Sequence, residues 1–136
     1  MRGSMQTYRK VSVDSNLAVA SPHRIIQMLF AGALERLAQA KWAIEQGDIE
    51  KRGIFMGKAI GIVAGLNSSL NMDAEGDVAG NLNHLYDFML RRMSEANVNS
   101  DPKAIDEVVS LLKTLKEGWD NIPQDKHHIS ANPETN

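Results

Sequence analysis

Residues 53–69 read GIFMGKAIGIVAGLNSS, and this spacing is typical of a helix with two different apolar sides. At about 100° per residue, one side is an ordinary core stripe. The stripe consists of Met56, Ala59, Ile60, Val63, Leu66 and Leu70. The opposite side of a surface helix normally carries Lys and Glu. Here it carries glycine at every fourth position, as Gly53, Gly57, Gly61 and Gly65, and Lys58 is its only charged residue.

The glycines need an explanation because each costs roughly 1 kcal/mol relative to Ala inside a helix. A strip without side chains lets another backbone approach closely. The pattern leaves three interpretations open: a helix of the same bundle packs there, a partner helix or extended segment binds there, or the helix is only weakly formed. The second interpretation predicts a partner-binding groove formed by Ile54, Gly57, Gly61, Ile62, Gly65 and Phe88.

The composition is that of one globular domain with a moderate core. The chain has 136 residues, of which 43% are hydrophobic and 24% are charged. The net charge of −2, without any block of like charge, argues against binding to nucleic acid or to an anionic membrane. The absence of cysteine excludes disulfides and thiolate metal sites and fits a reducing cytosol. No apolar run approaches the roughly 20 residues of a membrane span.

Two sequence signals mark helix starts. Ser21-Pro22 and Asp101-Pro102 each place a capping side chain before a proline at the first helical position. With the apolar spacing, these signals predict helices over about 22–46, 49–70, 77–97 and 102–120. We therefore expect an all-α protein, an antiparallel up-down four-helix bundle over residues 21–122.

The segments outside the bundle are expected to be an N-terminal arm, residues 1–20, and a disordered C-terminal tail, residues 123–136. The first four residues, MRGS, resemble a vector-derived leader. Tyr8, Val11 and Leu17 are the candidate anchors of the arm on the bundle. Trp42 lies off the core stripe of its helix, as an edge aromatic or as an interface contact.

No catalytic, metal or cofactor site is predicted. The Glu-x-x-His motif of di-iron bundles is absent, and the four histidines are interpreted as surface residues: His23, His84, His127 and His128. The glycines do not have the spacing of a phosphate-binding loop. Two alternatives to a partner-binding module remain: a histidine phosphotransfer module acting through His84, and a self-associating structural bundle whose glycine strips meet.

Several segments together resemble one family, FliS, the flagellin-specific export chaperone of bacterial flagella. They are residues 24–33 (RIIQMLFAGA), 69–73 (SLNMD), 81–89 (NLNHLYDFM), Ala96-Asn97, and residues Glu107-Val108, Leu111-Leu112 and Trp119 of the last helix. The order and spacing of these segments carry the resemblance. Phe30-Ala31, where many relatives have Tyr-Asp, and the inserted Met72 depart from the family pattern.

The resemblance implies a chaperone of the bacterial cytosol and not an enzyme. Its client would be the disordered C-terminal region of flagellin, which hydrophobic grooves of the bundle would hold. Binding would prevent premature polymerisation and assist delivery to the flagellar export gate. The arm would cap the surface in the free protein, and Tyr8 matches the family's N-terminal tyrosine. No nucleic acid or membrane insertion is expected, and a homodimer is left open.

Overall fold

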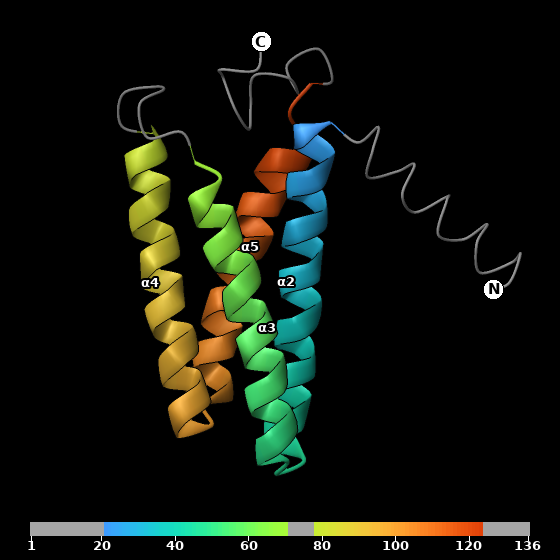
Figure 1. Cartoon of the computed structure of the whole chain (residues 1–136), viewed down its shortest axis with the longest axis vertical. Coiled ribbons are helices and arrows are strands. Elements are labelled where there is room, and N and C mark those ends of the chain that lie inside the picture. The colour runs from blue at the N-terminus through green and yellow to red at the C-terminus, as the bar shows by residue number, and fades with distance from the viewer. Residues whose placement is uncertain (1–20, 71–77, 124–136) are drawn as a thin grey trace, which may run out of the picture.

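The structure is a computed structural model that describes residues 21–70 and 78–123. It contains four α-helices: α2 (Pro22–Glu45), α3 (Ile49–Ser68), α4 (Val78–Asn99) and α5 (Pro102–Asp120). In Figure 1 they stand side by side, with α3 in front of α5. Both α2 and α4 contact α3 and α5, so α2 and α4 are diagonal to each other. This confirms the predicted all-α four-helix bundle. The predicted arm, and the predicted tail beyond Pro123, lie outside the described residues.

The predicted capping signals form as expected. The Ser21 hydroxyl accepts a hydrogen bond from the Arg24 backbone N–H at 3.1 Å. The Asp101 carboxylate accepts one from the Lys103 backbone N–H at 3.0 Å. Each cap satisfies a backbone donor that has no partner within its helix. The helices therefore start where their sequences indicate.

A tight turn folds α3 back against α2. Gly47 has a φ of +72°, a conformation that glycine adopts without a steric penalty. Its N–H donates to Ile44 O at 3.0 Å, and the Asp48 N–H donates to Ala43 O at 2.8 Å. The Asp48 side chain then caps α3 by accepting from the Lys51 N–H at 3.0 Å. Three residues thus end one helix and begin the next.

The core follows the predicted stripes. On α3, four of the six predicted stripe residues are buried, whereas Ile60 and Leu70 are half-buried at its flanks. Buried apolar side chains from all four helices form one cluster. The largest of them are Leu37, Met56, Leu66, Met89, Met93, Ile105 and Leu112. Burial of such side chains contributes the main stabilising free energy of the bundle.

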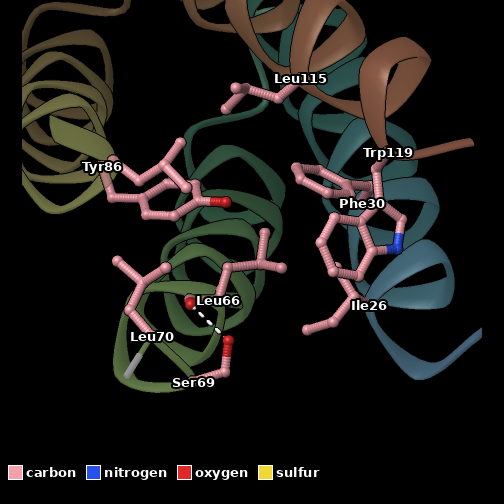
Figure 2. Close-up of a pocket in the computed structure, with 9 residues that line it drawn as sticks. Ile26, Phe30, Leu66, Ser69, Leu70, Tyr86, Leu115 and Trp119 are labelled. Carbon is pink, nitrogen blue, oxygen red and sulfur yellow. Dashed lines mark hydrogen bonds between the residues drawn. The ribbon is translucent and has the colours of Figure 1, made fainter. Parts of the chain in front are cut away.

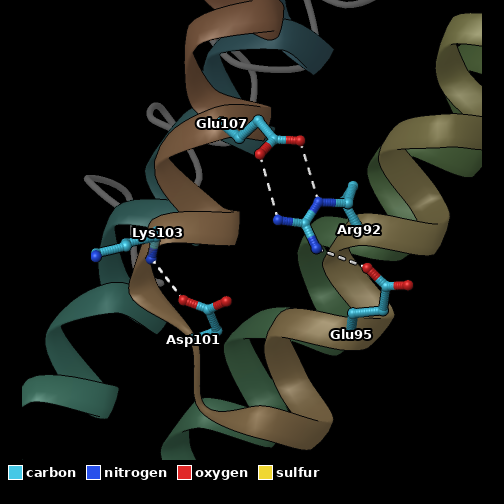
Figure 3. A network of polar contacts seen from close by, with 5 residues as sticks. All are labelled: Arg92, Glu95, Asp101, Lys103 and Glu107. Atoms are coloured by element: carbon cyan, nitrogen blue, oxygen red, sulfur yellow. Dashed lines mark hydrogen bonds and ion pairs between the residues drawn. The ribbon is translucent and has the colours of Figure 1, made fainter.

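Polar contacts at the periphery identify which flank of each helix faces its neighbour. Arg92 of α4 donates to both carboxylate oxygens of Glu107 on α5, at 3.1 and 3.2 Å, and also to Glu95 at 2.6 Å (Figure 3). Lys41 of α2 pairs with Asp106 of α5 at 2.9 Å. Exposed ion pairs of this kind contribute little to stability, because water screens them. They do show, however, which flanks of α4 and α2 face α5.

Candidate functional site

The glycine side of α3 faces away from the other described helices. A Cβ atom built on any of Gly53, Gly57, Gly61 and Gly65 would meet no heavy atom within 4 Å. Gly57 and Gly61 are exposed. For the described part of the chain, this excludes the interpretation that a helix of the same bundle packs on the strip. We call the surface of these four residues the glycine face.

Ile54 and Ile62 lie on different sides of the glycine face. Ile54 is 49% exposed and forms part of the same outer surface. Ile62 is half-buried and leans toward α2, because a Cβ atom at Gly32 of that helix would lie 3.4 Å from Ile62 Cδ1. The structure therefore places Ile54 on the open surface and Ile62 at the boundary between α3 and α2.

Phe88 does not lie beside the glycine face. It lies one turn before Arg92 and thus shares the flank of α4 that faces α5, where Arg92 binds Glu107. The other flank of α4 meets α3, where Asn83 donates to Asn67 at 2.9 Å. Phe88 itself is half-buried against the core. A helical wheel of one helix cannot supply this rotation, because it depends on the neighbours of that helix.

A second apolar feature lies at the end of the bundle where α2 begins and α5 ends. It is a cavity of about 100 Å³ between all four helices (Figure 2). Its lining residues are Ile26, Phe30, Leu66, Ser69, Leu70, Leu82, Tyr86, Leu115 and Trp119. We call it the end pocket. It cannot be predicted from the sequence, because its walls come from four separate helical stripes, each of which alone looks like ordinary core.

The end pocket contains one hydroxyl group that points inward. Figure 2 shows the Tyr86 hydroxyl directed into the cavity, toward Phe30 and Trp119. The Tyr86 side chain is 4% exposed, and burial raises its pKa to about 12. Tyr86 is therefore a neutral hydrogen-bond donor at physiological pH. The Ser69 hydroxyl is already engaged, since it donates to Leu66 O at 2.7 Å. The pocket suits an apolar group that carries one hydrogen-bond acceptor.

One wall of the end pocket rests on a buried histidine. The His23 ring stacks on the Trp119 ring, with centroids 4.9 Å apart and 9° between the planes. Trp119 Nε1 also donates to the His23 carbonyl oxygen at 2.9 Å. His23 is 2% exposed, so its interpretation as a surface histidine is wrong. The reason is that the first turn of α2 packs beside the last turn of α5.

In the described part of the chain, the other histidines do not line these surfaces. His84 is exposed on α4, as predicted, whereas His127 and His128 lie outside the described residues. Within residues 21–70 and 78–123, no cluster of three His, Cys, Asp or Glu side chains could hold a metal ion. Nor does any helix in those ranges combine the length and the apolar character needed to cross a membrane.

Comparison with known proteins identifies the family. The sequence model of the family described as "Flagellar protein FliS" matches residues 4–126. The chain is 50% identical over 131 residues to the flagellar secretion chaperone FliS of Vibrio cholerae, and the match covers 96% of both chains. It is 47% identical over 119 residues to the flagellar secretion chaperone FliSB of Pseudomonas aeruginosa, covering 88% of this chain and 94% of the relative. It is 43% identical over 119 residues to FliS of Salmonella typhimurium, covering 87% and 88% of the two chains. The chain therefore belongs to the FliS family of flagellar secretion chaperones, which is not a family of enzymes.

Proposed function

We propose that this protein binds the disordered C-terminal region of flagellin in the bacterial cytosol, keeps it from polymerising and delivers it to the flagellar export gate. The observation that carries the proposal is the uncovered glycine face of α3. A helix normally covers its outer side with charged residues, and here that side admits a closely packed backbone. The membership of a secretion-chaperone family supports a client as the occupant.

The distribution of exposed apolar side chains also supports a client-binding surface on the side of the bundle formed by α2 and α3. Among the described residues, the exposed large hydrophobics are Ile25, Met28, Trp42, Ile49, Ile54 and Val98. All but Val98 belong to α2 and α3. Single exposed apolar residues are normal on any protein, but their concentration on two adjacent helices is typical of an interaction surface. A disordered client that folds along α2 and α3 would cover them.

The end pocket supports a role for the arm. The described chain enters α2 at Ser21, five residues before the pocket residue Ile26. In our proposal the arm, with Tyr8, Val11 and Leu17 as its anchors, covers apolar surface while no client is bound. A covered state competes with the client and lowers its apparent affinity in proportion to the covered fraction. The arm would thereby limit self-association without any change in the bundle.

Calorimetric titration tests the proposal. The ligand is the C-terminal region of flagellin from the same organism, about 50 residues long, which is enough to fold over a large surface. We expect a one-to-one complex with a large negative heat-capacity change and a gain of helicity. If folded protein, with and without its arm, shows no binding at ligand concentrations of tens of micromolar, the proposal is wrong.

A further inference from the structure

A hollow with an aromatic wall lies at the end of α2 and α3 opposite the end pocket. It is lined by Ala38, Gln39, Trp42, Lys51 and Phe55, and we call it the tryptophan notch. Trp42 is 49% exposed and Phe55 is half-buried. Partly exposed tryptophan in a concave site is a frequent anchor of protein interfaces, because it offers a large rigid apolar surface. Neither the glycine face nor the end pocket includes these residues.

The notch carries a positive charge. Lys51 is the only charged residue in its lining, and Lys51 Nζ lies 5.6 Å from the centroid of the Trp42 ring. The nearest carboxylate oxygen, Asp48 Oδ2, is 4.0 Å from Nζ, and Asp48 also caps the helix. The surrounding hairpin has the same sign. Residues 21–70 contain six Lys and Arg against four Asp and Glu, a net charge of +2, whereas residues 78–123 contain five against seven, a net charge of −2.

The notch is continuous with the glycine face. Ile54 precedes Phe55 in the chain and lies one turn after Lys51, so it stands between the notch and Gly57. Ile54 is itself 49% exposed. Along α3, Lys51 of the notch is about one helical turn, roughly 5 Å, from Ile54, so a client segment on the glycine face ends close to the notch.

We infer that the tryptophan notch is a subsite for the client, and that it takes one apolar side chain with a carboxylate beside it. The side chain packs on Trp42 and Phe55, and the carboxylate pairs with Lys51. Gln39 lines the same notch, and its side chain is held there because Arg36 donates to its Oε1 at 2.9 Å. The inference rests on the proposed binding of the C-terminal region of flagellin.

Fluorine NMR of the full chain reports on the notch directly. The chain has two tryptophans, so labelling with 5-fluorotryptophan gives two signals, and Trp42→Phe assigns them. Addition of the C-terminal region of flagellin should shift the Trp42 signal and protect it from a soluble paramagnetic quencher. An unchanged Trp42 signal in the saturated complex would overturn the subsite.

Calorimetry of two variants measures what the notch contributes. Trp42→Ala and Lys51→Glu should each weaken binding about tenfold, as loss of an interface anchor or reversal of a paired charge does. The loss in Lys51→Glu should shrink as salt is raised. Val98→Ala is the matched control, because Val98 is 78% exposed at the C-terminal end of α4. Circular dichroism verifies that each variant is folded.

The outcomes separate the subsite from the proposed function. Normal binding by Trp42→Ala would overturn the subsite and leave client binding intact. Normal binding by Lys51→Glu alone would overturn the carboxylate contact. If the unaltered protein, tested with and without its arm, does not bind the C-terminal region of flagellin, the proposed function fails and the subsite fails with it.

Discussion

At the scale of single residues, two glycines have opposite effects on stability. Gly47 has a φ of +72°, whereas Gly118 lies in the exposed surface of α5 with nothing within 4 Å of a built Cβ atom. Gly47→Ala should lower the free energy of unfolding by about 1 kcal/mol, because a side chain is strained at that φ. Gly118→Ala should raise it by about 0.5–1 kcal/mol, because alanine favours the helix. Urea unfolding of both variants tests the pair, and equal effects would contradict the assigned turn.

Because Tyr86 is buried, we expect the free energy of unfolding to depend on pH in the alkaline range. Burial raises the pKa of its hydroxyl from 10.0 to about 12 in the folded state. Between these values the unfolded chain releases the proton and the folded chain does not, so the unfolded state gains stability as pH rises. The unfolding free energy should therefore fall by about 2 kcal/mol from pH 10 to pH 12, beyond what other groups contribute. Tyr86→Phe should remove that part of the fall in urea titrations, and an identical pH profile in both proteins would refute it.

At the scale of the element, α3 has one side that packs in the core and an opposite side, the glycine face, that no described helix covers. Gly61→Leu adds a side chain where a built Cβ atom meets nothing, so the bundle should stay folded and its helicity should be equal or higher. The same side chain should obstruct a closely packed client and reduce binding to the C-terminal region of flagellin at least tenfold. Circular dichroism and calorimetry measure the two effects, with Gly118→Leu as the control on α5. Unfolding of Gly61→Leu would show that the strip is covered within the protein itself.

The helices were predictable because their signals are local. The stripe around Met56, the Ser21 and Asp101 caps and the outward glycine pattern each depend on one helix and its ends. His23 was wrongly interpreted as a surface residue, and the flank of α4 that carries Phe88 could not be predicted, because both depend on how one helix is rotated against another. The tryptophan notch was only partly predictable. The sequence places Trp42 off the core stripe of α2, but the turn at Gly47 is needed to bring Phe55 of α3 close to Trp42.

At the scale of the whole molecule, the two hairpins differ in character. Among the described residues, the α2–α3 hairpin carries all the exposed large hydrophobics except Val98. Residues 21–70 have a net charge of +2, and residues 78–123 have a net charge of −2. Exposed apolar surface promotes self-association, so a second copy of the chain would compete with the client for this surface. Light scattering over a dilution series measures this competition. A dimer that persists at high dilution and excludes the client would favour a structural bundle over a chaperone.

Deletion of the N-terminal arm tests whether it covers apolar surface of the bundle. Deletion of residues 1–17 removes Tyr8, Val11 and Leu17 but none of the described helices, so the helix content should stay nearly unchanged. If the arm covers apolar surface in the free protein, its loss should increase the binding of an apolar fluorescent dye. It should also strengthen binding to the C-terminal region of flagellin, because no protein remains in the covered state. A variant with Tyr8→Ser, Val11→Ser and Leu17→Ser should behave like the deletion, which assigns the effect to the anchors. Unchanged dye binding together with unchanged client affinity would show that the arm does not cover the client surface.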